Sequence, residues 1–329
     1  MNYDLPYFIK TKDDNISFVI FYFPPKEYFI GFPKLLATTE RTKINIDGIY
    51  YNRLKGYKKW FFGKLNKIRR YLKYSENFGE KIYIFQKKDI KKIYHPLDFY
   101  KNILKDKSES CHIKNTVELI KSISRLIGIN KKDIGIEGST LFSYFNENSD
   151  IDVLIYGYKN AIKIAGGFYE LAQNKNIRIY NGKNSSAISR DKKNLEFGGN
   201  KKNIIIQEAR RFYGFIRGKR FSIINVLNNG DKPNINLNRK IKYIGLFKNI
   251  LSITDVKYSI VTPSILLGRT LNGERYRVEL ITHYGINQAR KNDKFFIKGK
   301  IYQDIVTQEK IIIISFWSRI KQQFDLITR

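Results

Sequence analysis

The spacing of two acidic residues in front of an apolar run constrains the fold of this chain more than any other feature. Asp150 and Asp152 are separated by one residue and precede an apolar run that begins at Val153. In a strand this spacing places both carboxylates on one face, and Ile151, Val153 and Ile155 on the other. Two adjacent like charges are costly unless a cation neutralises them. The segment therefore predicts a strand whose acidic face binds a hard divalent cation, and magnesium is the natural choice.

A second short motif lies upstream, where Gly138 and Ser139 follow an expected strand and open an expected short helix. Glycine lets the backbone approach a phosphate group closely, amide groups at the helix start point outward, and the Ser139 hydroxyl can donate a hydrogen bond. From Ser139 to Asp150 is eleven residues (150 − 139), and both lie at the ends of adjacent expected strands. A phosphate-binding turn beside a metal-binding strand is suited to phosphoryl transfer.

The elements expected around these motifs alternate between helix and strand. Apolar periodicity predicts helices over 113–126 and 159–174, a loop with a short helix over 138–145, and strands over 133–137, 151–156 and 221–227. Short β-branched and aromatic runs predict further strands over 16–23, 28–37, 48–54 and 81–86, and over 258–267, 276–282, 294–302 and 310–315. These patterns predict an α+β fold, in which a central α/β domain with a mixed sheet and helices stands between two β-rich domains.

The expected boundaries divide the chain into three domains. Residues 1–107 form the β-rich N-terminal domain, 108–250 the central domain, and 251–329 a small β-barrel-like domain with a C-terminal tail. Short strands separated by turn signals favour a barrel at the C-terminus. A five-stranded oligonucleotide-binding barrel is one candidate, but periodicity alone does not select it.

The combination of strand, Gly-Ser, short helix, Ser-Asp-Ile-Asp and apolar run resembles the signature of the DNA polymerase beta superfamily of nucleotidyltransferases. The flow IGIEGSTLFSYFNENSDIDVLIYG, with Gly157 directly after the strand, is similar to stand-alone prokaryotic nucleotidyltransferase-domain proteins with β-rich flanking domains. YFPPKEYFIGFPKLL and VELITHYGINQARKNDKFFIKGKI look like their flanking modules. The resemblance implies that Asp150 and Asp152 are catalytic residues that hold Mg²⁺, and that Gly138 and Ser139 bind a nucleoside triphosphate, with ATP as the expected donor.

The third catalytic carboxylate of that superfamily has no clear counterpart. The expected strand 221–227 offers Asn225 where an acid is wanted, and an amide can coordinate a metal but cannot accept a proton. Glu196, Glu208 or Glu279 could replace it, although each is more often a solvated surface acid. Catalysis is therefore less firmly implied than nucleotide binding.

Charge indicates the partner. The chain holds 61 Lys and Arg against 30 Asp and Glu, a net charge of +31, and a polyanion is the simplest explanation. Nucleic acid, and RNA in particular, is the expected partner. The basic stretch 53–73 is interleaved with aromatics, which suits bases and phosphates together, although a solvated helix or hairpin with its aromatics in the core is an equal alternative. The residues expected to contact nucleic acid are Lys58, Lys59, Arg69, Arg70, Arg210, Arg211 and Arg217.

Several other classes of protein are disfavoured. The apolar runs are too short to cross a bilayer as a helix, and the N-terminus does not resemble a signal peptide, so we expect a cytoplasmic protein without a membrane partner. The single Cys111 excludes an internal disulfide. His95, His112 and His283 have no spacing typical of metal ligands, and we expect them to be surface or packing residues.

Two functions from different classes follow. The first is a magnesium-dependent nucleotidyltransferase that transfers a nucleotide from a nucleoside triphosphate to an acceptor, expected to be RNA. A small-molecule or protein acceptor fits the same motifs but leaves the charge of +31 unexplained. The alternative is a non-catalytic nucleic-acid-binding protein with a vestigial nucleotidyltransferase fold. Asn225 favours this alternative, whereas the retained Asp150 and Asp152 disfavour it.

Overall fold

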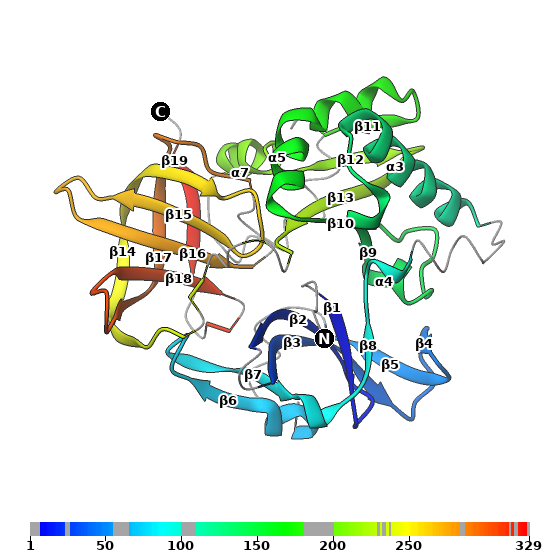
Figure 1. The fold of residues 1–329 in the computed structure, drawn as a ribbon, viewed down its shortest axis with the longest axis horizontal. Coiled ribbons are helices and arrows are strands. Elements are labelled where there is room, and N and C mark those ends of the chain that lie inside the picture. The colour runs from blue at the N-terminus through cyan, green and yellow to red at the C-terminus, as the bar shows by residue number, and fades with distance from the viewer. Residues whose placement is uncertain are drawn as a thin grey trace. The chain divides into compact units, whose positions relative to one another are not determined.

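The chain forms two compact units in a computed structural model (Figure 1). The structure describes residues 7–23, 27–54, 66–99, 110–180, 201–228, 231, 235–236, 238–282, 287–315, 317–318 and 322–327. The first unit comprises Met1–Lys73, Ile82–Ile179 and Tyr213–Lys232, and the second comprises Tyr74–Lys81, Tyr180–Phe212 and Pro233–Arg329. The predicted division into 1–107, 108–250 and 251–329 stays a prediction.

An antiparallel sheet of eight strands begins the chain, and its apolar and aromatic runs are the strand signals of the sequence. The strand order is β4-β5-β3-β2-β1-β8, and β7 pairs with β3 and β6. The bounds are β1 Tyr7–Thr11, β2 Ile16–Phe23, β3 Tyr28–Thr38, β4 Ile44–Ile46, β5 Ile49–Arg53, β6 Leu72–Ser75, β7 Glu80–Gln86 and β8 Ile90–Tyr94, with 3-10 helices η2 Asn66–Tyr71 and η3 Lys87–Asp89. Gly31 is required where β3 meets β2, because a Cβ there would lie 2.0 Å from the carbonyl oxygen of Phe18.

A sheet of five strands forms the rest of the first unit, in the order β11-β12-β13-β10-β9. Its strands are β9 Ile134–Glu137, β10 Ile151–Tyr156, β11 Ile177–Ile179, β12 Tyr213–Ile216 and β13 Lys219–Val226. The helices of this region are α3 Cys111–Ile127, η4 Lys131–Asp133, α4 Gly138–Leu141, α5 Tyr158–Gly167 and η5 Phe168–Gln173. Helix α5 packs against β10 and β13, and α3 packs against α5 and η5 (Figure 1).

The second face of this sheet meets residues of the N-terminal region within the same unit. Tyr156 on β10 stacks on His95 at 6.2 Å between ring centroids, and His95 stacks on Tyr7 at 6.3 Å. A Cβ on Gly135 would lie 2.9 Å from both Pro96 and Tyr156, so this strand accepts only glycine without rearrangement. Asp152 shares the face of Tyr156, since the two are four residues apart on one strand.

The second unit contains a sheet of six strands that closes on itself, because β14 pairs with both β15 and β17. Its strands are β14 Ile241–Tyr258, β15 Ser264–Arg269, β16 Arg275–Ile281, β17 Lys294–Asp304, β18 Lys310–Ser315 and β19 Gln323–Ile327, and its helix α7 spans Lys201–Ala209. The inward-facing side chains form one apolar core that includes Leu251, Leu266, Val278, Phe295 and Ile312. The strand β14 runs through position 250, where the sequence patterns had placed a domain boundary.

The predicted fold class, α+β with a central α/β nucleotidyltransferase domain of mixed sheet and helices, is wrong. The described residues are mostly β, with 49% in strands and 21% in helices, and they form three sheets with few helices. In the five-stranded sheet only β10 and β13 are parallel, and β11, β12 and β13 follow one another antiparallel. Antiparallel neighbours such as β11, β12 and β13 need no helical crossover between them. This part of the chain therefore contains fewer helices than a series of βαβ units would. No helix among the described residues combines the length and apolar character needed to cross a bilayer.

Candidate functional site

The turn from β9 into α4 brings the two sequence motifs together. Gly138 opens α4 with φ +68°, and a Cβ at this position would lie 3.0 Å from Oδ2 of Asp152. Only glycine adopts this left-handed conformation at little cost while leaving room for the carboxylate. The helix α4 is four residues long, so the dipole expected behind Ser139 is small. The close approach of the turn to Asp152 therefore depends on the backbone conformation at Gly138 and not on the helix.

Asp152 is held by a neighbour that the sequence patterns did not indicate. Ser222 lies directly beside it in the parallel pairing of β10 with β13, and the Ser222 hydroxyl donates to Asp152 Oδ1 at 2.7 Å. Asn225 pairs with Ile155, so it lies on the opposite face of the sheet and is fully buried. The expectation that Asn225 stands where a third acid is wanted is corrected, because a hydroxyl occupies the position next to Asp152.

A second carboxylate lies across the other edge of β10. Glu137 is the register partner of Asp152 in the antiparallel pairing of β9 with β10, so both side chains are on one face. Glu137 is buried, and its Oε2 makes no hydrogen bond within the described structure. Burial first, and then the charge of Asp152, raise the pKa of Glu137 to about 8, although Lys34 opposes this. Sequence reasoning did not single out Glu137, and the signal that could have found it is its position as the last residue of the strand before Gly138.

Lys34 of the N-terminal sheet acts on this acidic pair, and Arg53 of the same sheet acts on Lys34 and on Tyr144. Lys34 on β3 is half-buried; burial lowers its pKa, while Glu137 and Asp152 counteract part of this effect. Burial raises the pKa of Tyr144, and Arg53 at the end of β5 opposes part of this increase. The first unit thus gathers two carboxylates and two cations at one place. Such a set can bind a ligand that carries phosphate together with a divalent cation.

Whether these residues fit a magnesium ion can be judged from the carboxylates. Glu137 is buried and its Oε2 has no hydrogen-bond partner among the described residues, and the half-buried Asp152 lies beside it on the same face of the sheet. Asp150 immediately precedes β10 and is half-buried. The described residues contain no group of three or more His, Cys, Asp and Glu side chains arranged to hold a metal ion. The residues fit a cation that takes one or two carboxylates here and further ligands from phosphate oxygens, as Mg²⁺ commonly does.

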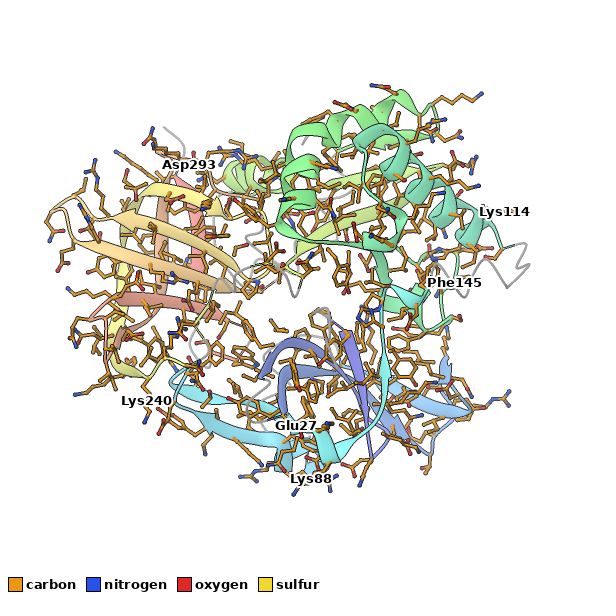
Figure 2. All side chains as sticks on the ribbon, viewed as in Figure 1. Glu27, Lys88, Lys114, Phe145, Lys240 and Asp293 are labelled. Atoms are coloured by element: carbon orange, nitrogen blue, oxygen red, sulfur yellow. The ribbon has the colours of Figure 1, made fainter. Side chains whose placement is uncertain are left out.

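His112 supports the glycine turn from helix α3. Lys219 donates to His112 Nδ1 at 3.1 Å, so in the neutral ring Nε2 carries the proton and donates to Thr140 Oγ1 at 2.7 Å. Phe145, labelled in Figure 2, stacks on the imidazole at 4.4 Å between centroids. Burial and then Lys219 lower the pKa of His112 to about 4. His112 is thus a buried packing residue, as one of the two expectations had it, and its hydrogen-bond partners could not be predicted because they are distant in the chain.

The basic residues expected to bind nucleic acid fall into different environments. Lys58 and Lys59 lie outside the described residues. Arg69 and Arg70 are exposed on η2, and Arg70 pairs with Asp13 at 2.6 Å. Their role in nucleic-acid binding stays a prediction.

The remaining arginines of that prediction form ion pairs. In the first unit, Arg217 pairs with Glu118 at 2.6 Å. In the second unit, Arg210 pairs with Asp293, which Figure 2 labels, and Arg211 pairs with Glu208 at 3.2 Å. Contacts of these three residues with nucleic acid stay a prediction, and their described partners are acids of the protein itself.

The acids offered as replacements for the third carboxylate are also placed. Glu196 lies outside the described residues. Glu208 and Glu279 belong to the second unit, where Glu279 is fully buried and accepts from Arg239 at 2.5 and 2.7 Å. Glu279 is therefore not the solvated surface acid that its residue type made more probable in the sequence.

Comparison of the chain with protein-family models, with curated proteins and with solved structures finds no match.

Proposed function

We propose that this protein is a magnesium-dependent nucleotidyltransferase that transfers a nucleotide from a nucleoside triphosphate, with ATP as donor, to RNA. The observation that carries the proposal is the close approach of the Gly138 turn to Asp152, since a Cβ on Gly138 would lie 3.0 Å from Asp152 Oδ2. It unites the Gly-Ser turn and the Asp-x-Asp strand on which the resemblance to the DNA polymerase beta superfamily rests. A glycine turn against a carboxylate is suited to a bound triphosphate, because backbone and cation contact the same phosphates.

The residues divide the chemical work between them. Mg²⁺, held by Asp150 and Asp152, would neutralise the triphosphate and the charge that develops during transfer. Ser222 fixes the orientation of Asp152, and Gly138 and Ser139 would bind phosphate through the turn. In the reaction an acceptor hydroxyl forms a bond to the α-phosphorus, the α–β phosphoanhydride bond breaks, and pyrophosphate leaves. The hydroxyl proton passes to solvent or to a nearby carboxylate.

The choice of RNA as acceptor rests on charge. A net charge of +31 favours a polyanion, and a small-molecule or protein acceptor would not require it. A charge of this size also predicts that RNA binding weakens steeply as salt increases.

We propose a cytoplasmic location on the sequence patterns alone.

One observation favours the alternative of a non-catalytic nucleic-acid-binding protein. Next to Asp152 on the adjacent strand stands Ser222, a hydroxyl that donates to the carboxylate and is not an acid. A site that lacks a third carboxylate there could bind a nucleotide without turning it over. Glu137 on the other neighbouring strand favours the catalytic function, because it adds a buried carboxylate beside the half-buried Asp152.

The experiment that tests the proposal measures transfer of label from α-labelled triphosphates to total RNA in the presence of Mg²⁺. We expect labelled RNA with the wild type, and at least a hundredfold loss in Asp150→Asn and in Asp152→Asn. The matched control is Asp255→Asn, which removes an exposed acid of β14 and should leave transfer unchanged. Equal inactivity of wild type and variants with all four nucleotides, while RNA binding persists, would replace the proposal with the non-catalytic alternative.

A further inference from the structure

The closed sheet of the second unit carries a groove on its outer face. The groove has a volume of about 700 Å³ and is lined by residues of the β15–β16 hairpin, of β14 and of the start of β18. Its walls include Leu267, Arg269, Arg275, Arg277 and Lys310. Leu267, Arg269, Arg275 and Arg277 alternate along their strands with residues of the hydrophobic core and point away from it, while Tyr276 belongs to both the core and the groove lining.

Two arginines of this groove are forced to face each other. Arg269 and Arg275 are register partners at the end of the β15–β16 hairpin, and both are exposed. Like charges directly opposite on neighbouring strands are destabilising. The hairpin turn fixes this pairing, since Thr270 N donates to the carbonyl of Glu274 at 3.0 Å and Gly273, with φ +87°, donates to Thr270 at 3.1 Å.

The acids near the groove do not neutralise this pair. Glu274 accepts from Lys310 at 2.9 Å and from the hydroxyl of Tyr276 at 2.7 Å. Within the described structure neither Arg269 nor Arg275 forms an ion pair or a hydrogen bond with a carboxylate. The described lining holds four cationic side chains against two carboxylates, of which Glu274 is already paired. The unmatched positive charge is thus concentrated where the two arginines meet.

We propose that this groove binds the phosphate backbone of single-stranded nucleic acid, with Arg269 and Arg275 as phosphate contacts. A guanidinium group offers two parallel N–H donors, which match phosphate oxygens and relieve the repulsion between the arginines. Apolar surface adjoins the charge, because Leu267 is 39% exposed and Leu271 at the hairpin tip is 89% exposed. Unstacked bases can cover such surface, whereas the bases of a duplex are already stacked. This inference specifies how the proposed RNA acceptor is held, but it is tested without a triphosphate and stands if transfer fails.

The experiment measures binding of a fluorescent 12-nucleotide single-stranded RNA to the full chain by anisotropy at several salt concentrations. We expect the double variant Arg269→Gln with Arg275→Gln to bind at least tenfold more weakly. Loss of two phosphate contacts should also reduce the slope of log affinity against log salt by about 1.4, since single strands contribute about 0.7 for each phosphate. The double variant with lysine at both positions should recover part of the affinity.

The matched control is Lys242→Gln with Lys248→Gln, which removes the same charge from exposed positions of β14 outside the groove lining. It should change affinity less than threefold. Equal losses in both double variants, with unchanged thermal unfolding, would show a general charge effect and overturn the groove. Displacement of RNA by polyglutamate as readily as by unlabelled RNA would also overturn it, because the groove would then recognise acidic polymers in general.

Discussion

Glu137 in the first unit and Glu279 in the second are both buried strand carboxylates, but the charges nearest to them differ. Glu279 lies beside arginines, whereas Glu137 lies beside another acid. Arg239 contacts Glu279 through two donors, and Arg277 adds a third at 2.8 Å. Burial alone would raise the pKa of Glu279, but these arginines outweigh it and lower the pKa. At Glu137 burial and the neighbouring Asp152 act together, so its pKa rises to about 8.

The difference separates a structural carboxylate from a candidate functional one. Glu279 has its charge matched by the protein, so its ion pairs hold the second unit together without any ligand. Glu137 has its charge opposed by a second acid and only partly compensated by Lys34. Strongly raised pKa values of this kind concentrate at functional sites, where a ligand or cation completes the charge balance.

The largest expected effect comes from removing Arg239, the main ion-pair partner of Glu279. Arg239→Met leaves Glu279 buried with only Arg277, and removal of one partner of a buried ion pair costs about 3–5 kcal/mol of unfolding free energy. Urea unfolding of wild type and variant measures this loss. The double variant that adds Glu279→Gln should recover much of it. A loss below about 1 kcal/mol would show that Glu279 is not held by this pair.

The next effect concerns the Gly138 turn, which lies close to Asp152. Gly138→Ala places a Cβ 3.0 Å from Asp152 Oδ2 in a backbone with φ +68°, and this left-handed conformation alone costs alanine about 1–2 kcal/mol. We expect thermal unfolding at a lower temperature. Gly166→Ala in α5 is the matched control, since a Cβ there meets nothing within 4 Å and should stabilise the helix by about 0.5–1 kcal/mol. Equal responses of the two variants would contradict a tight turn at Gly138.

A smaller effect, which depends on pH, should appear at Glu137 itself. Its folded pKa of about 8 lies above the unfolded value, so between about pH 4.5 and 8 the folded state binds one proton more than the unfolded state. Stability therefore falls as pH rises through this window. Glu137→Gln resembles the protonated carboxyl and does not titrate, so its melting temperature should rise relative to that of the wild type from about pH 4.5 to 8 and then stay at a constant difference. An exposed control, Glu170→Gln, removes no buried carboxylate. A constant difference between Glu137→Gln and wild type from pH 5 to 9 would contradict the raised pKa.

The smallest effect concerns the pKa of the buried His112, whose charged neighbour is Lys219. His112 has a pKa of about 4, caused first by burial and then by Lys219. Lys219→Met should raise the pKa only in part, to a value that stays below 6.5, because the larger cause remains. NMR titration of the imidazole resonances measures this value. A pKa at or above 6.5 in the variant would show that Lys219, and not burial, dominates.

Local patterns predicted a substantial part of the fold. The strands 16–23, 151–156 and 310–315 agree with β2, β10 and β18, and the helix predicted over 113–126 lies within α3. The long strand β14 was missed because its exposed and buried positions do not alternate regularly. The fold class was wrong because it depended on how strands pair, and antiparallel pairing along β11, β12 and β13 could not be deduced from local periodicity.

By itself, the sequence determined that Asp152 lies on a strand face opposite Ile151 and Val153, and that a glycine turn precedes this strand. Both follow from alternation and from the backbone freedom of one residue, which are local properties. Tertiary structure alone decided which groups surround Asp152, because Ser222 is 70 residues away and Glu137 reaches it only through strand register. Register is fixed by burial of whole strands against their neighbours, so it is not contained in any short segment.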